Sequence, residues 1–262
     1  MNFSISNIAW NSADDEAVYA MMQKNGFFGL EIAPTKIIPE APYSHTDRAV
    51  AWVGDLKDRF GFCVPSMQSI WYGKGEKLFG SEYERNNLLD YTQSAIDFAS
   101  SIGCKNLVFG CPKNRAKPDG MDENIAVKFF KTLGDYAAKK NVCIGMEANP
   151  EIYGTNFVNT TEQAFDLIRR VGSDGFKLNL DVGTMIQNGE SISVLQKKVM
   201  LINHVHISEP FLKKIEAREL HRDLVDFLKK EKYSGFVSVE MGMQDNLSDI
   251  ESAMKYVVSI DN

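Results

Sequence analysis

The sequence predicts an α/β fold, a single (β/α)8 TIM barrel, on three observations. Short apolar runs alternate with amphipathic helical stretches along the whole 262-residue chain. Eight such units occupy about the length that a closed barrel needs. The apolar runs are nearly continuous, which is typical of parallel strands covered on both faces.

The strand-like runs are spaced regularly. They cover residues 3–10, 27–34, 62–71, 106–110, 142–149, 176–183, 204–210 and 236–242. A helix is expected after each run, including one over 191–203 after the sixth. Capping-box spacing predicts helix starts at Asn159 and Ser248. Glycine occupies the expected helix C-caps, at Gly26, Gly61, Gly103, Gly172 and Gly235.

A doubly wound open sheet is the alternative architecture. Such a sheet usually carries a Gly-rich phosphate-binding turn after its first strand, and IAWNSADDE follows instead. Because no Pro- or Ser-rich linker divides the chain, we expect one barrel domain over 1–262. The longest non-periodic segments follow strands, where barrels carry their functional loops: 35–43, 72–83, 111–120 and 149–158.

Composition excludes several classes of protein. The net charge of −6 disfavours a surface that binds nucleic acid, because phosphate recognition needs clustered Lys and Arg. The opening MNFSISNIAW lacks the features of a secretory signal, and no apolar run approaches a membrane span. The four cysteines are far apart and form no CxxC pair, which favours free thiols. We therefore expect a cytoplasmic protein without a membrane or nucleic-acid partner.

Ionisable residues stand near the ends of the last four strand-like runs. GMEAN, NLDVG, HVHIS and SVEMG contain Glu147, Asp181, His206 and Glu240. These residues are 34, 25 and 34 positions apart, each interval being about one strand–helix unit. Since the carboxyl ends of barrel strands meet at one face, we expect the four side chains to share a common volume.

Three carboxylates and one imidazole form a suitable ligand set for a divalent metal. Mn²⁺, Mg²⁺, Co²⁺ and Fe²⁺ accept this set in roughly octahedral geometry, and Zn²⁺ is an alternative. Ordinary ion pairing is the competing interpretation for any single residue, and Lys177 is close in sequence. His204 precedes His206 by two residues on the same strand face, so we expect it deeper, as a second-shell or core histidine.

Further residues at strand ends are candidates for substrate contacts. Trp71 and Phe109 could wall a sugar pocket, although aromatic residues in strands more often belong to the core. Gln68, Asn149 and Lys113 lie at or just beyond strand ends and could bind hydroxyl groups.

The strand-end pattern resembles the xylose isomerase-like barrels, the sugar phosphate isomerase/epimerase family that shares the AP endonuclease family 2 fold. Its members include ketose 3-epimerases, hydroxypyruvate isomerase, inosose dehydratase and endonuclease IV. The resemblance covers essentially the whole chain and depends on Glu in GMEAN, Asp in NLDVG, His in HVHISEP and Glu in FVSVEMG. Glu31 in GLEIAP also fits the family's appearance.

The resemblance implies one divalent ion, with Mn²⁺ favoured, and an acid–base pair, Glu147 and Glu240. Asp181 and His206 would then only anchor the metal. A metal on a substrate carbonyl stabilises the enediolate formed when the adjacent carbon loses a proton. A carboxylate on each face of that carbon removes and returns the proton, which gives isomerisation or epimerisation.

Two positions depart from the ketose epimerase pattern. Thr184 stands where that pattern has a histidine, and Leu212 stands where it has an arginine. Glu209 matches and is expected to bind substrate. Lys213 and Lys214 adjoin Leu212 and could supply positive charge to an acidic substrate, or could simply be solvated.

The sequence thus predicts a metal-dependent isomerase or epimerase of a small sugar or related hydroxy-carbonyl compound. A dehydratase of an inosose-like polyol ketone on the same site is the alternative. An endonuclease IV-like phosphodiesterase needs more histidines than the four present. A non-catalytic barrel is a further alternative, and homo-oligomers are common among the relatives.

Overall fold

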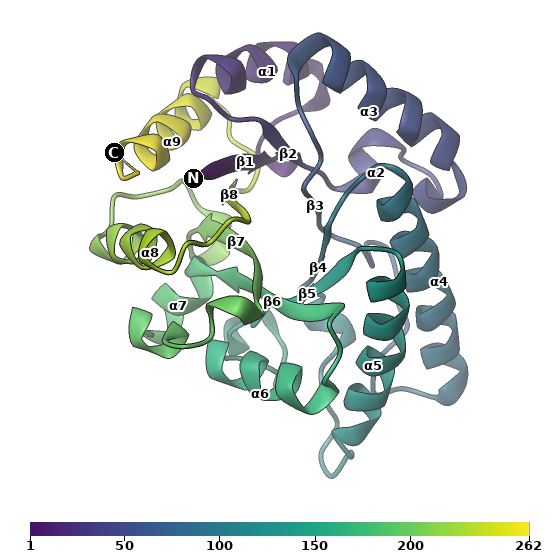
Figure 1. Ribbon diagram of the computed structural model, residues 1–262. Helices are drawn as coiled ribbons and strands as arrows, with labels where there is room; N and C mark the ends of the chain where they lie inside the picture. The colour runs from purple at the N-terminus through teal and green to yellow at the C-terminus, as the bar shows by residue number, and fades with distance from the viewer. Residues whose placement is uncertain (262) are drawn as a thin grey trace.

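A computed structural model describes residues 1–261, and Figure 1 shows parallel strands surrounded by a ring of helices. The strands are β1 (Asn2–Ser6), β2 (Gly29–Glu31), β3 (Ser66–Met67), β4 (Asn106–Phe109), β5 (Cys143–Met146), β6 (Phe176–Asp181), β7 (Ile202–Ser208) and β8 (Phe236–Glu240). Each lies within or beside its expected run, so the strand prediction is confirmed.

The sheet closes almost completely on itself. Its strand order is β2-β1-β8-β7-β6-β5-β4-β3. The edge strands β2 and β3 are joined by the isolated parallel bridges Gly29↔Cys63 and Ile32↔Met67. The predicted (β/α)8 TIM barrel is therefore confirmed.

Helices lie on the outside of the barrel (Figure 1). The α-helices are α1 (Asp15–Lys24), α2 (Pro34–Ile37), α3 (Thr46–Phe60), α4 (Glu82–Ser101), α5 (Asn124–Lys139), α6 (Thr161–Val171), α7 (Val182–Asn188), α8 (Glu219–Lys230) and α9 (Leu247–Ser259). The short 3-10 helices are η1 (Asn7–Ala9), η2 (Ser12–Asp14), η3 (Pro42–Ser44), η4 (Pro112–Asn114), η5 (Glu151–Tyr153), η6 (Ile192–Leu195), η7 (Val199–Leu201) and η8 (Pro210–Leu212). Within residues 1–261, no helix has the length and apolar character of a membrane span.

The predicted helix over 191–203 is wrong. The helix after β6 is α7, which begins directly at the strand end because Asp181 accepts a hydrogen bond from the Thr184 amide as its N-cap. The remaining segment forms only η6 and η7, and Lys197 between them is left-handed, with φ 61°. A left-handed residue ends any α-helix, so the segment cannot form one.

Both predicted helix starts are also wrong. The cap of α6 is Thr160, which forms a capping box with Gln163, one residue later than expected. The cap of α9 is Asn246, whose side chain makes no capping bond. The C-cap prediction is confirmed at Gly26, Gly61, Gly103 and Gly172, which have positive φ, and is wrong at Gly235, which does not.

The barrel interior is polar, whereas most barrels are filled by branched apolar residues. Alternate residues of each strand face inward, and hydrogen bonds join these side chains across the interior. Asn106 of β4 donates to Ser66 of β3 at 3.0 Å and to Asn179 of β6 at 3.3 Å. The apolar core instead fills the layer between strands and helices, where Ile5, Leu107 and similar side chains are fully buried.

The four cysteines are free thiols, as predicted. Cys104 and Cys143 are buried, Cys111 is partly buried and Cys63 is exposed. Burial raises the pKa of the Cys104 thiol to about 12, so it stays protonated at neutral pH.

Candidate metal centre

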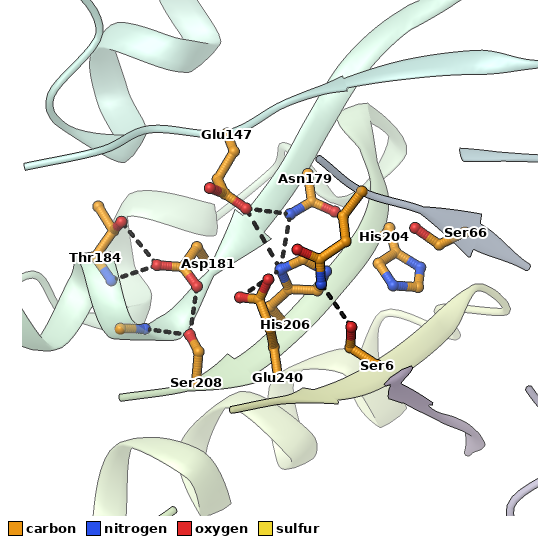
Figure 2. A network of polar contacts seen from close by, with 12 residues as sticks. Ser6, Ser66, Glu147, Asn179, Asp181, Thr184, His204, His206, Ser208 and Glu240 are labelled. Atoms are coloured by element: carbon orange, nitrogen blue, oxygen red, sulfur yellow. Dashed lines mark hydrogen bonds and ion pairs between the residues drawn. The ribbon is translucent and has the colours of Figure 1, made fainter. Parts of the chain in front are cut away.

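Four side chains from successive strands converge at the carboxyl end of the barrel (Figure 2). One ligand atom from each of Glu147, Asp181, His206 and Glu240 lies within 4.8 Å of the other three. The sheet register explains this convergence, because Asp181 pairs with His206, and Glu240 pairs with Ser208. His206 is fully buried, and Glu147 and Glu240 are nearly so.

The imidazole of His206 lies between the carboxylates. Its Nδ1 is 3.1 Å from Glu240 Oε2 and 3.4 Å from Glu147 Oε2. Burial by itself lowers the pKa of His206, but the neighbouring Glu240 and Glu31 carboxylates outweigh it and hold the pKa well above its usual value. Without a metal, an imidazolium therefore supplies the positive charge among these acids.

Two acids of the cluster, Asp181 and Glu240, resist ionisation. Burial, with like charges nearby, raises the pKa of Glu240 to about 7 and that of Asp181 to about 6. A cation placed among these oxygens would relieve both the desolvation and the repulsion. The buried Glu/His cluster is therefore consistent with a divalent metal site.

Asp181 is fixed by donors on both of its oxygens. The amide and hydroxyl of Thr184 reach Oδ2 at 2.7 and 2.8 Å, and Ser208 Oγ donates to Oδ1. The Thr184 hydroxyl also lies 2.8 Å from the carbonyl of Ala148. Thr184, which replaces the histidine of the ketose epimerase pattern, thus orients Asp181 from a buried position.

Glu31 of β2 contacts the other side of His206. Its Oε2 lies 2.9 Å from His206 Nε2, and both side chains are fully buried. Burial by itself raises the pKa of Glu31, but the two histidines outweigh it and hold the pKa well below its usual value. If an ion took the place of the Nδ1 proton, the carboxylate on Nε2 would keep the proton there and leave the Nδ1 lone pair facing the carboxylate cluster.

Glu31, His204 and His206 form a second group with ligand atoms within 4.8 Å. His204 Nε2 lies 3.1 Å from Glu31 Oε2, although the contact lacks the alignment of a hydrogen bond. Two ions would share His206 only if its ring lost both protons. The cluster around Nδ1 is therefore the candidate metal site, with Glu31 and His204 behind it. This position agrees with the deeper placement expected for His204.

Amide side chains orient Glu147. Asn149 donates to Oε1 at 2.8 Å, and Asn179 donates to Oε2 at 3.0 Å. Asn149 is in turn held by Arg115, a fully buried guanidinium whose pKa burial lowers to about 10. Asn179 and Arg115 were not singled out in the sequence. Strand parity would have indicated Asn179, which lies two residues before Asp181.

A cavity of about 200 Å³ opens above the cluster. Its wall consists of Gln68, Ser69, Val108, Gly110, Cys111, Pro112, Glu147, Asn149, Tyr153, Asp181, Glu209, Leu212 and Glu240. Three of the expected substrate contacts, Gln68, Asn149 and Glu209, are therefore at the wall. Glu209 is already bound by Arg218, whose Nε donates to Oε1 at 2.7 Å.

The other expected contacts lie elsewhere. Trp71 Nε1 donates to Thr92 of α4 at 2.8 Å, and the indole packs edge-on against Phe109 at 4.6 Å. Both rings are buried in the layer between strands and helices, so they belong to the core and do not wall a sugar pocket. Lys113 is exposed on η4. These three side chains do not line the cavity.

Tyr153 is a cavity residue that the sequence did not single out. It belongs to η5, in the predicted functional loop 149–158. Its hydroxyl accepts a hydrogen bond from the Phe211 amide at 2.7 Å and keeps its own proton for a ligand. In the sequence, only the length of this loop indicated that it would contribute residues to the site.

Comparisons with known proteins agree with the fold. The chain belongs to the xylose isomerase-like TIM barrel family, whose model matches residues 21–259. Comparison with curated proteins gives no match.

Among solved structures, the chain is similar to 3-keto-D-glucoside 4-epimerase from E. coli, with a TM-score of 0.79, 16% identity, and 99% of both chains covered. It is also similar to D-psicose 3-epimerase from Clostridium cellulolyticum H10, with a TM-score of 0.80, 14% identity, and 100% of this chain and 98% of that one covered. A probable 3-DHS dehydratase from Bacillus anthracis has a TM-score of 0.70 and 14% identity, with 99% of this chain and 98% of that one covered. These identities establish a shared fold.

Proposed function

We propose that this protein is a divalent-metal-dependent isomerase or epimerase of a small sugar or related hydroxy-carbonyl compound. The convergence of Glu147, Asp181, His206 and Glu240 at the base of a cavity carries the proposal. The sugar epimerases among its structural neighbours support it. The small cavity, below the range of about 300–1,000 Å³ typical of drug-sized ligands, favours a small substrate.

The four side chains would hold one ion, for which oxygen-rich donors favour Mn²⁺ over Zn²⁺. Mg²⁺, Co²⁺ and Fe²⁺ are alternatives with similar preferences. When bound, such an ion supplies Lewis acidity that stabilises negative charge on a substrate oxygen. Asp181 and His206 serve as anchors, because Thr184, Ser208 and Glu31 already fix their orientation.

Glu147 and Glu240 would move the proton. Both line the cavity; Glu147 directly follows β5 and Glu240 ends β8, and these strands lie on opposite sides of β7 in the sheet. Without a metal, burial raises the pKa of Glu240 to about 7, and a bound ion would lower it and leave a carboxylate able to accept a proton. Asn149 and Asn179 each donate to a different oxygen of Glu147 and so fix the direction of its carboxylate.

Proton exchange in D₂O tests this function directly. The protein is loaded with Mn²⁺, Co²⁺ or Mg²⁺ and incubated with ketoses and inososes, and NMR follows the hydrogen next to the carbonyl. We expect deuterium incorporation with at least one compound. Glu147→Gln and Glu240→Gln should each slow it by roughly 10²–10⁴-fold. Glu251→Gln, on the outer helix α9, is the matched control and should leave exchange unchanged.

The outcomes separate the alternatives. Exchange without loss of water supports an isomerase or epimerase, whereas an unsaturated product supports the dehydratase. Cleavage of abasic-site DNA would favour the phosphodiesterase. If no compound exchanges and elemental analysis finds no metal in the loaded protein, the barrel is non-catalytic and the proposal fails.

A further inference from the structure

The cavity above the carboxylate cluster has an unusual charge balance. Its wall contains four acidic side chains, Glu147, Asp181, Glu209 and Glu240, but no Lys, Arg or His among residues 1–261. Arg218 balances Glu209, to which it donates through both Nε and Nη2. A divalent ion would leave the other three acids with one net negative charge. Glu31, behind His206, adds another acid below.

The cationic side chains around the cavity do not line its wall. Arg115 is fully buried behind the wall, where it donates to the carbonyl oxygens of Glu147 and Val158 and to Asn149. Lys214 forms an ion pair with Asp249 on the surface. Lys213 is exposed, and neither lysine lines the cavity wall.

Neutral hydrogen-bonding groups remain available at the wall. Gln68 donates through Nε2 to Ser6 and Glu31, while its Oε1 accepts no hydrogen bond from the described residues. The Ser69 hydroxyl likewise has no partner among residues 1–261, and Tyr153 retains a proton to donate. These groups match the hydroxyls of a polyol. A phosphate or carboxylate would instead lose its hydration next to acids, and no cationic side chain at the wall would pair with it.

We propose that the substrate is an uncharged, monosaccharide-sized ketose or polyol ketone without a phosphate or carboxylate group. This inference rests on the proposed function and narrows it to one substrate class. It excludes sugar phosphates, keto acids and abasic-site DNA as substrates of this cavity.

Charge-matched pairs test the inference. D-Ketohexoses and their 6-phosphates are compared for deuterium exchange with the metal-loaded protein. We expect kcat/KM for the best neutral sugar to exceed that of every phosphate by at least tenfold. Equal or faster exchange of a phosphate overturns the inference while leaving the proposed function intact. Absence of exchange in the full ketose and inosose panel instead counts against the proposed function.

Binding of unreactive polyols provides a second readout. D-Sorbitol, D-sorbitol 6-phosphate and D-gluconate share a carbon skeleton and differ in charge, so calorimetry at 50 and 300 mM salt compares them. We expect D-sorbitol to bind at least tenfold more tightly than either anion, with little dependence on salt. Tighter binding of an anion, or failure of D-sorbitol to bind, contradicts the inference.

A positive charge introduced at the wall should weaken the preference for the neutral polyol. Leu212 lines the cavity and bonds only through its backbone, to Glu209 and Gly242. Leu212→Arg should bind D-sorbitol 6-phosphate at least tenfold more tightly than wild type, because a guanidinium pairs with phosphate. Leu212→Gln, also polar but neutral, is the matched control and should show no gain. Equal affinities in two folded variants would contradict a charge-based exclusion.

Discussion

The two halves of the barrel differ in how their strands end. β5 to β8 span four to seven residues and place Glu147, Asp181, His206 and Glu240 around one point. β1 to β4 span two to five residues, and β3 has only two. Of the candidates near their ends, Gln68 reaches the cavity, whereas Trp71 and Phe109 turn into the outer core.

The difference shows where strand alternation can be extrapolated. The β6–β7 ladder has a register shift between Leu178 and Asn179, but it is regular from Asn179 to Asp181, so Asp181 and His206 are paired neighbours. β3 ends at Met67, and Ser69 then adopts a left-handed conformation with φ 55°. This turn redirects the chain, and Trp71 reaches Thr92 of α4. Parity therefore holds while the backbone stays extended, as far as Glu147 and Gln68, and fails where it turns left-handed at Ser69.

Substitution of Glu31 should have the largest effect, because this residue connects the β1–β4 half of the barrel to the candidate metal site. Glu31→Gln keeps the side-chain shape but removes the charge that orients His206. We expect metal affinity to fall by roughly 10–100-fold, measured by competition with a chelating dye. Glu251→Gln on α9 is the control. An unchanged affinity would mean that β5 to β8 form the site without help from the first half.

The raised pKa values predict that two quantities change in opposite directions as pH rises. The free energy of unfolding of the metal-free protein should decrease, and the metal affinity should increase. The folded-state pKa values of Glu240 and His206 lie above their usual values, so each contributes stability at low pH that is lost as pH rises through its folded pKa. Between pH 6.5 and 8.5 the free energy of unfolding of the metal-free protein should therefore decrease. Metal affinity should rise by up to tenfold per pH unit for each proton released.

Urea denaturation and metal titration across this pH range measure both effects. Burial lowers the pKa of His204, so its contribution to the free energy of unfolding is complete above about pH 6.5 and does not change over this range. Glu240→Gln should flatten the decrease in stability of the metal-free protein. A stability that rises with pH in the metal-free wild type would contradict the described charge state of the cluster.

The smallest expected effects distinguish core from cavity within one loop. Trp71→Phe removes the hydrogen bond to Thr92 and some buried volume, so we expect it to lower the free energy of unfolding by about 1–3 kcal/mol. Its KM should stay within about twofold of wild type, since the indole does not line the cavity. Ser69→Ala should do the reverse, raising KM severalfold with little loss of stability. A large KM change in a stable Trp71→Phe variant would restore the aromatic-wall interpretation.

Much of the cluster was predictable because its signals are local. Glu147 and Asp181 stand at the ends of apolar runs, and one strand–helix unit separates each cluster residue from the next. The caps of α6 and α9 were less predictable, since several polar residues near each start compete for the position. The prediction of a helix over 191–203 was wrong because the helix after β6, α7, begins directly at the strand end with Asp181 as its N-cap.

The sequence by itself determined the eightfold alternation and the four inward residues of β5 to β8, because hydrophobic period and strand parity act over a few residues. The tertiary structure alone decided that Glu31 contacts His206, 175 residues away. It also decided that the cavity wall, within residues 1–261, consists of acidic and neutral side chains and includes no cationic side chain. Barrel closure brings these distant residues together, so their contacts depend on the packing of the whole chain.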